Sequence, residues 1–234
     1  MQINATQSAI LLRRYKRFLA DVRFPCGAET TAHVANPGAM LGLAEPGRQV
    51  WLSEAKPGRE LGWSLQLVQA EGGLVGVDTS LPNRLAEEAI LGGRIAELAG
   101  YSELKREVAY GEASRIDLLL TRPGAPPVYV EVKNVHLHRG GGLAEFPDCK
   151  AARSAKHMGE LARTAAAGAR AVVLFVVQRQ DCEAFAPAAD IDPKFAAALL
   201  EAISAGVEPL VYGCTLTQTA IEIARPLKLR LASG

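Results

Sequence analysis

Two neighbouring segments, 114–120 and 128–135, constrain the fold of this chain more than any other part of its sequence. Both alternate polar and apolar residues, which is the period of a β-strand with two different faces. The link between them, 122–127, holds three prolines and a glycine and cannot continue either strand. We therefore predict an antiparallel hairpin that turns near Gly124.

In such a hairpin Asp117 lies opposite Glu131, and Arg115 lies opposite Lys133. Successive residues of a strand point to opposite faces, so Asp117, Glu131 and Lys133 are expected to share one face. The apolar residues between them are then expected to share the core face: Ile116, Leu118, Val130 and Val132.

Two carboxylates directly across a sheet repel each other. Lys133 and Arg115 would offset part of that repulsion, and a divalent cation would offset it better because hard cations take oxygen ligands. A metal ion with two carboxylates and a lysine is suited to hydrolysing a phosphodiester. The same residues also suit the charged, solvent-facing side of an ordinary hairpin, and spacing alone leaves both interpretations open.

Length and charge narrow the class of protein. The 234 residues allow one large domain or two small ones, and 49% of them are hydrophobic, which is ample for a packed core. The formal net charge is only +1, so any surface that binds nucleic acid must be local.

The cysteines and the apolar runs bear on the compartment. Four cysteines lie far apart without a C-x-x-C pair, so we expect buried, reduced thiols in place of a disulfide framework or a zinc site. Basic residues within 13–17 interrupt any apolar leader, and no apolar run reaches membrane-spanning length. We expect a cytoplasmic protein with no membrane partner.

The first 80 residues predict a small β-barrel. Short strand-like runs occur at 17–24, 49–52, 64–69 and 74–77, separated by turns rich in proline and glycine. Closely spaced short strands with such turns are typical of a sandwich or barrel, and a five-stranded OB-like barrel fits this length. We place this domain at residues 1–80.

The pattern changes after residue 80, where helices and strands alternate. We expect a helix at 83–99, strands at about 104–110, 114–121 and 128–135, a helix at about 149–167, a buried strand at 171–177, a helix at 193–204 and strands near 208–214 and 219–224. Asp192 and Pro193 form an N-cap followed by proline at the first helical position. Residues 81–234 thus predict a second, α/β domain, in an α+β chain overall.

The order helix, three strands, helix, strand, with Asp117 and then Glu131-x-Lys133, resembles the PD-(D/E)xK nuclease superfamily. More specifically, the chain resembles the sugar fermentation stimulation protein A (SfsA) family, over nearly its whole length. The matching stretches are 14–22, 36–40 (Asn-Pro-Gly-Ala-Met), 83–85, 104–108, 114–117, 129–135, 146–148 (Phe-Pro-Asp) and 156–157.

That resemblance implies an N-terminal OB-like domain, a nuclease-like αβββαβ domain, and binding of single- or double-stranded DNA with little sequence preference. It also implies a regulatory link to the use of sugars such as maltose. Asp117 and Glu131 would be ligands of Mg²⁺ or Mn²⁺, with the Val132 carbonyl as a third. Lys133 would position the attacking water or stabilise charge on the phosphate. Glu88, on the helix that opens the second domain, is a further candidate metal ligand.

Basic residues supply the candidates for DNA contact, since they neutralise phosphates while aromatic rings stack on unpaired bases. Tyr15 and Phe18 lie within the first basic stretch, which could instead be a charged edge strand with one ring in the core. Arg153 shares a predicted helix face with Lys156 and His157. The candidates are Arg13, Arg14, Lys16, Arg17, Arg23, Arg115, Arg153 and Lys156.

One departure from the family pattern puts catalysis in question. The family places a threonine and a small glycine-containing step before Lys-His, whereas this chain has Ala151 and Ser154 there. The missing hydroxyl would remove a contact near the site. Three hypotheses stay open: a metal-dependent deoxyribonuclease, a non-catalytic DNA-binding regulator, and an enzyme that acts on RNA or on a small phosphorylated nucleotide. Oligomeric state is open too, a homo-oligomer included.

Overall fold

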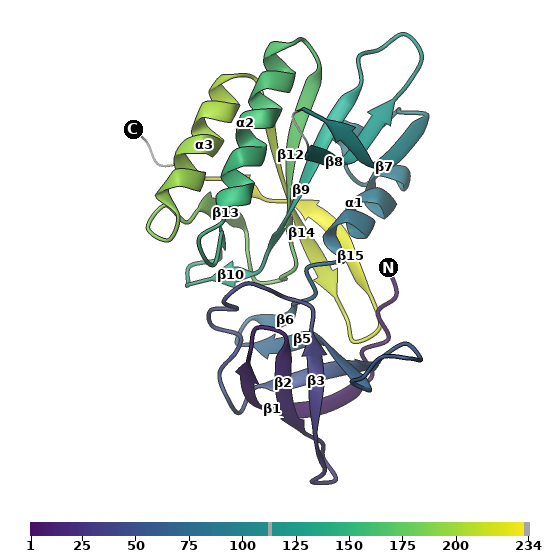
Figure 1. Ribbon diagram of the computed structural model, residues 1–234, viewed down its shortest axis with the longest axis vertical. Helices are drawn as coiled ribbons and strands as arrows, with labels where there is room; N and C mark the ends of the chain where they lie inside the picture. The colour runs from purple at the N-terminus through teal and green to yellow at the C-terminus, as the bar shows by residue number, and fades with distance from the viewer. Residues whose placement is uncertain (112–113, 232–234) are drawn as a thin grey trace.

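The computed structural model describes residues 1–111 and 114–231, and it places a β-barrel at one end of the molecule and an α/β domain at the other (Figure 1). The barrel domain contains β1 (Gln7–Tyr15), β2 (Leu19–Arg23), β3 (Glu29–Val34), β4 (Gln49–Glu54), β5 (Trp63–Ala70) and β6 (Gly73–Gly76). Neighbouring strands follow the order β3-β2-β1-β4-β5-β6.

A parallel pairing between β3 and β5, at His33–Ser64 and Val34–Leu65, closes this sheet on itself. Closure removes the open edges that a flat sheet would expose. Alternate residues of β1 point inward, among them Ala9 and Leu11, and pack with Val22 in a core that the barrel strands share. The predicted OB-like barrel is confirmed.

The individual barrel strands were only partly predictable. The expected strand at 17–24 corresponds to β2 alone, while β1 and β3 were not expected. Lys16 and Arg17 form the turn between β1 and β2, with positive φ angles of 46° and 64°. Strand β1 ends directly before them, at Tyr15.

The second domain begins with α1 (Pro82–Leu91) and a short 3₁₀ turn (Ala96–Leu98). The further elements follow in this order: β7 (Glu103–Tyr110), β8 (Ser114–Thr121), β9 (Val128–Val135), β10 (Leu137–His138), β11 (Leu143–Phe146), α2 (Ala152–Ala166), β12 (Arg170–Val177), β13 (Ala184–Pro187), α3 (Pro193–Ser204), β14 (Glu208–Leu216), β15 (Ile221–Pro226) and β16 (Lys228–Leu229). The expected order of a helix, three strands, a helix and a strand is confirmed in α1, β7, β8, β9, α2 and β12, with β10 and β11 inserted before α2.

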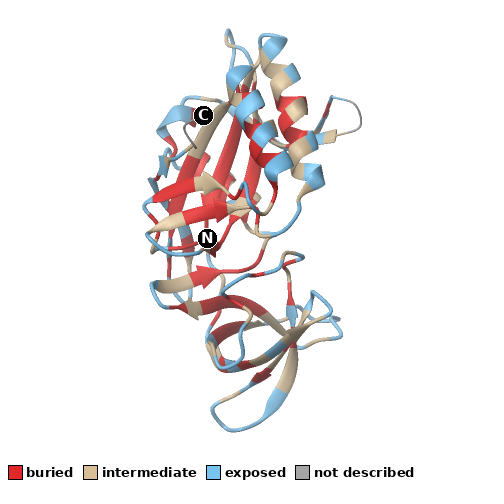
Figure 2. Cartoon of the chain, turned by 90° about the vertical axis from the view of Figure 1, so that its left-hand side faces the viewer, coloured by how far each residue is buried: buried red, intermediate tan, exposed pale blue. Residues whose placement is uncertain are grey.

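The main sheet of this domain has the order β15-β14-β12-β9-β8-β7 and is covered on both faces. Helix α1 lies on one face, and α2 and α3 lie on the other (Figure 1). Figure 2 shows buried residues along the central strands and exposed residues on the outer sides of the helices. Strand β12 pairs in parallel with both β9 and β14, as its continuous apolar sequence predicts.

Helix α1 is shorter than the expected helix at 83–99. It ends at Leu91 because two glycines follow, and Gly93 adopts a positive φ of 68°. Glycine reaches this left-handed conformation without steric cost and commonly terminates helices. The backbone N–H of Arg94 then turns back to the carbonyl of Ala89.

The predicted hairpin between β8 and β9 forms, and three of its four expected core residues share one face, Ile116 being the exception. Backbone pairing runs from Leu120–Val128 to Leu118–Val130. Ile116 packs into the core under α2 and α3, whereas Leu118 packs into the core under α1. The strand therefore changes faces at Asp117, beside Glu107, whose φ of 52° interrupts the neighbouring strand β7.

The two domains share contacts outside the linker. Residues 1–5 lie along the β14–β15 hairpin, where the N–H groups of Ile3 and Ala5 donate to the carbonyls of Thr219 and Gln218. Barrel residue Trp51 joins the core beneath α1. Among the residues that the structure describes, every helix is too short or too polar to cross a membrane.

Candidate functional site

Asp117 lies on β8, directly beyond the last backbone pair with β9. Its Oδ2 accepts a hydrogen bond from the backbone N–H of Val132 at 2.7 Å, and its Oδ1 accepts one from Asn83 Nδ2 at 2.8 Å. The carboxylate thus takes the place of a strand–strand hydrogen bond, and the two strands separate here. Asn83 comes from the first turn of α1, so three elements converge on one carboxylate.

Glu131 and Lys133 lie on β9 and are buried, with 2% and 8% of their surfaces exposed. Lys133 Nζ is 2.7 Å from Glu131 Oε1, and the same oxygen contacts Nδ1 of His157 on α2. Because α2 covers this face, the interpretation of a solvent-facing charged hairpin is wrong. A buried carboxylate needs partners of this kind, since an uncompensated buried charge is very costly.

Several polar atoms around this cluster have no hydrogen-bond partner within the described parts of the chain. They are Glu131 Oε2, both carboxylate oxygens of Glu160, and the hydroxyl of Tyr110. Glu160 comes from α2 and is 1% exposed. Lys156 Nζ lies 3.6 Å from Glu160 Oε1, within ion-pair range but beyond hydrogen-bond range. Unsatisfied buried groups are rare in proteins, and they concentrate here.

The pKa shifts show how strongly these groups interact. Burial, followed by the charge of Glu131, raises the pKa of Asp117. Burial acts against the charged form of Glu131 too, but the hydrogen bond from His157 and the charge of Lys133 outweigh it and lower its pKa. Burial and the nearby charges of Glu131 and Glu160 raise the pKa of Tyr110. Shifted pKa values of interacting groups in one cluster are typical of functional sites.

This cluster has some of the properties of a divalent-cation site. Glu131 Oε2 is a buried anionic oxygen with no partner in the described residues, and Asp117 interacts with it electrostatically. Oxygen donors of this kind suit Mg²⁺ and Mn²⁺. No group of three or more histidine, cysteine, aspartate and glutamate side chains in residues 1–111 and 114–231 is arranged to hold a metal. Two carboxylates would therefore need a backbone carbonyl or water molecules to complete the ligand set.

Glu88 is engaged elsewhere. Its Oε2 lies 3.0 Å from the amino terminus of Met1, and that amino group also donates to the carbonyl of Ile221. The α1 residue that reaches Asp117 is Asn83, five positions earlier in the chain. The structure therefore assigns Glu88 a contact with the N-terminal segment, and its expected place beside the metal ligands is not observed.

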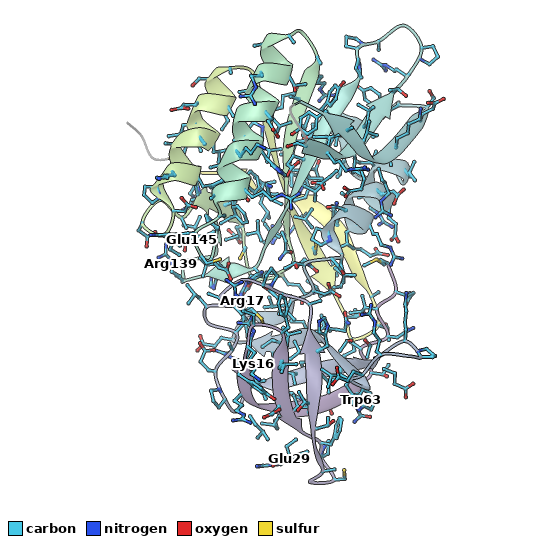
Figure 3. All side chains as sticks on the ribbon, viewed as in Figure 1. Lys16, Arg17, Glu29, Trp63, Arg139 and Glu145 are labelled. Carbon is cyan, nitrogen blue, oxygen red and sulfur yellow. The ribbon has the colours of Figure 1, made fainter. Side chains whose placement is uncertain are left out.

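Several of the basic residues expected to contact DNA form hydrogen bonds or ion pairs with other residues of the barrel domain. Arg13 donates to Asp21 and lies over the ring of Tyr15. Arg23 pairs with Glu29 near the far end of the barrel, where Figure 3 labels that glutamate. Arg14 donates to backbone carbonyls of the neighbouring turns, at residues 17, 36, 38 and 39.

The remaining basic candidates divide between the site and open surface. Arg153 donates to His157 Nε2 at 3.3 Å, and Lys156 lies near Glu160, so both belong to the rim of the acidic cluster. Arg115 is exposed and donates to the carbonyl of Glu107. Lys16 and Arg17 are exposed on the β1–β2 turn (Figure 3).

Sequence reasoning did not assign Asn83, Glu160 and Tyr110 to the site. The sequence could have indicated Glu160, because it follows Lys156 by four positions and His157 by three, and residues at that spacing share a helix face. The sequence could not indicate Asn83, since its contact with Asp117 depends on how α1 packs against β8. Ala151 is the N-cap of α2 and makes no side-chain cap, and Ser154 donates its N–H to the Ala151 carbonyl.

The fold and this cluster define a two-domain protein, with an OB-like barrel joined to an α/β domain that carries buried acidic residues. Family models agree: the SfsA N-terminal OB domain matches residues 12–77, and the sugar fermentation stimulation protein RE domain matches residues 80–220. The chain belongs to the sugar fermentation stimulation protein (SfsA) family.

Individual relatives support this assignment. A sugar fermentation stimulation protein homolog from Rhodospirillum centenum is 58% identical, over 94% of this chain and 95% of its own length. The homolog from Paramagnetospirillum magneticum is 54% identical, over 95% of this chain and 94% of its own. The solved structure of Pyrococcus furiosus SfsA in complex with Ca²⁺ is 31% identical, with a TM-score of 0.88 over 98% of each chain.

Proposed function

We propose that this protein binds DNA with little sequence preference and hydrolyses its phosphodiester bonds at Asp117, Glu131 and Lys133, with Mg²⁺ or Mn²⁺ as cofactor. The observation that carries the proposal is the buried, unpartnered Oε2 of Glu131, adjacent to Asp117 and to a buried lysine. A chain selected only for stability gains nothing from such an arrangement, because replacing buried ion pairs by apolar residues often stabilises a protein.

Each residue has a distinct task in this proposal. Asp117 and Glu131 would hold the cation, with the Val132 carbonyl as a further oxygen donor. A cation bound there would supply Lewis-acid chemistry for hydrolysis at neutral pH. Lys133 would hold the attacking water or stabilise negative charge that develops on the phosphate oxygens. Asn83 and His157 would orient the two carboxylates, through the hydrogen bonds that they make with them.

The relatives support this proposal at a coarser level. The Pyrococcus furiosus SfsA structure is a complex with Ca²⁺, a hard divalent cation with the same preference for oxygen ligands. The OB-like barrel adds support for binding to nucleic acid, since such barrels bind oligonucleotides on one face.

A second candidate function is a non-catalytic DNA-binding regulator linked to sugar use. It is favoured by the way the acidic residues are already compensated. Glu131 Oε1 is held by Lys133 and by His157, and both oxygens of Asp117 accept hydrogen bonds. In this case the cluster would be a structural remnant of a nuclease site.

Cleavage of labelled single- and double-stranded DNA separates the two candidates. The wild type would be compared with Asp117→Asn and Lys133→Ala in Mg²⁺, in Mn²⁺ and in EDTA, with DNA binding measured in parallel. Metal-dependent cutting that is lost in both variants, while binding persists, supports the nuclease. Binding without cutting by the wild type supports the regulator. Equal cutting by all three proteins would refute this site.

A matched control guards against loss of folding. Glu88→Gln changes a carboxylate on α1 that the structure pairs with the amino terminus. We expect it to leave cleavage within about twofold of wild type, because Asn83 is the α1 residue that contacts Asp117. A large loss of cleavage in this variant, with unchanged melting temperature, would return Glu88 to the list of metal ligands.

A further inference from the structure

A cleft of about 580 Å³ opens between the barrel and the start of α1. Its walls come from β3, from the β4–β5 connection and from the first turn of α1, and they include His33, Lys56, Arg59 and Arg84. That volume is within the range of ligand-binding clefts, which is about 300–1,000 Å³. None of the ion pairs described above involves Lys56, Arg59 or Arg84.

The rim of this cleft carries an exposed aromatic ring. Phe18 is 42% exposed, and its ring is stacked on His33, with centroids 6.3 Å apart and planes 12° apart. Its chain neighbour Leu19 lines the cleft. Scattered exposed hydrophobic residues are ordinary, but this ring stacks on a residue that lines a polar cleft. Aromatic rings in that position bind unpaired bases of any sequence.

The cations of the cleft are available to a ligand. Lys56, Arg59 and Arg84 are exposed and form no side-chain hydrogen bond or ion pair within the described residues. In contrast, Arg13 and Arg23 of the basic stretch form ion pairs with Asp21 and Glu29.

The cleft is close to neutral overall. Glu54, Glu60 and Asp78 also line it, in the same number as the three cations. The Asp78 carboxylate has partners within the protein, because its Oδ1 accepts hydrogen bonds from the N–H and hydroxyl of Ser80. Binding of a long duplex depends on many phosphate contacts, which this balance does not offer. A short unpaired segment, held by stacking and a few cations, suits it better.

The cleft also adjoins the acidic cluster. Arg84 lines the cleft, and the preceding residue, Asn83, donates to Asp117. Both residues belong to the first turn of α1. The first turn of α1 therefore contacts both the cleft and the candidate hydrolytic site.

We propose that this cleft binds an unpaired segment of single-stranded DNA, with a base stacked on Phe18 and adjacent phosphates at Arg59 and Arg84. The inference rests on the proposed DNA-binding function, and it specifies both the strandedness of the ligand and the surface that binds it. The main DNA-binding surface in this proposal is the cleft, in place of the basic stretch of β1 and β2 that the sequence suggested.

The test measures fluorescence anisotropy of a labelled oligothymidylate and of a duplex of equal length, without metal so that cleavage does not interfere. We expect the wild type to favour the single strand. Phe18→Ala should weaken that binding by about 5- to 100-fold, the usual effect of removing a stacking ring. Arg59→Ala and Arg84→Ala should each weaken it and reduce the slope of log K against log salt by about 0.7.

Two control variants match these changes away from the cleft. Leu91→Ala removes another exposed hydrophobic side chain, and Arg122→Ala removes an exposed arginine of the β8–β9 turn. Both should bind the oligonucleotide within about twofold of wild type. All variants alter exposed side chains, so unchanged melting temperatures should verify folding.

The outcomes separate this inference from the proposed function. Single-strand binding that survives in the Phe18, Arg59 and Arg84 variants would refute the cleft and leave DNA binding by another surface intact. A wild type that prefers the duplex would refute the cleft as well. A wild type that binds neither DNA would refute both the cleft and the proposed function.

Discussion

Asp148 Oδ2 accepts a hydrogen bond from the backbone N–H of Met40 at 2.8 Å, which ties the loop after β11 to a loop of the barrel. The same oxygen lies 3.1 Å from Nε2 of His136, at the end of β9. Met40 and Asp148 belong to sequence stretches that match the family, 36–40 and 146–148. Those stretches therefore lie at the contact between the domains, and their role at this contact is structural.

Asp148 should make the stability of the protein depend on pH. Burial opposes its charged form, but the hydrogen bond and charge of His136 outweigh burial and lower its pKa to about 2, from an ordinary value of 3.8. A depressed pKa contributes stability above the unfolded value, and that contribution is lost as pH falls through the folded value. Urea unfolding should therefore show a loss between about pH 4 and pH 2 that is smaller in Asp148→Asn. Parallel profiles would contradict this.

Removing the side chain tests the same contact at neutral pH. Asp148→Ala leaves the Met40 N–H and His136 without their acceptor, so we expect a loss of about 1–3 kcal/mol in the free energy of unfolding. Asp190→Ala is the matched control, because Asp190 is an exposed carboxylate that pairs with Arg139. We expect that control to stay within about 0.5 kcal/mol. Equal losses in the two variants would remove the special role of Asp148.

Gly38 is required for the close approach of the barrel loop to Asp148. A Cβ at this position would lie 2.7 Å from both carboxylate oxygens. Gly38→Ala should therefore displace the carboxylate and destabilise the protein by about 1–3 kcal/mol. Gly62→Ala is the control, because a Cβ there meets no atom within 4 Å. Additive effects of Gly38→Ala and Asp148→Ala would show that the two residues are not coupled.

The sequence predicted the elements that depend on local pattern. Strands β8 and β9 have the expected limits because the alternation of their sequences is uninterrupted. The end of α1 differs from the expected one because the helix stops before Gly92 and Gly93, which the expected helix includes. The face of Ile116 could not be predicted, since it depends on the positive φ of Glu107 in the adjacent strand.

The sequence predicted that Asp117 and Glu131 lie close enough to interact, and it did not predict the residues that surround them. Asp117, Glu131 and Lys133 follow from strand spacing, but their burial depends on α2, which lies over them only in the folded domain. The ion pair of Glu88 with the amino terminus of Met1 could not be predicted, because it joins residues far apart in the chain. The pairing of Arg13 with Asp21 depends on the register of β1 with β2, and β1 was not expected.

Asp192 should stabilise two helices at once. Its Oδ1 accepts from the N–H of Phe195 at the start of α3, as its N-cap position predicts, and its Oδ2 accepts from the N–H of Ala151 at the start of α2. An N-cap alone contributes about 0.5–2 kcal/mol. Asp192→Ala should therefore cost at least about 2 kcal/mol in urea unfolding, with Asp192→Asn between it and the wild type. A cost near that of a surface substitution would show that Ala151 does not depend on it.

The four thiols should react in a defined order. Buried thiols were expected throughout, which is correct for Cys182 and Cys214 and wrong for Cys26 and Cys149. Burial and the charge of Asp148 raise the pKa of the Cys149 thiol, and burial raises those of Cys182 and Cys214 to about 12. Because the thiolate is the reactive form, a disulfide reagent at pH 8 should label Cys26 first, Cys149 more slowly, and the buried pair only after unfolding. Cys26→Ser should remove the fast phase alone. Loss of that phase in Cys149→Ser would reverse the order, and it would mean that the negative charge of Asp148 does not suppress the neighbouring thiolate.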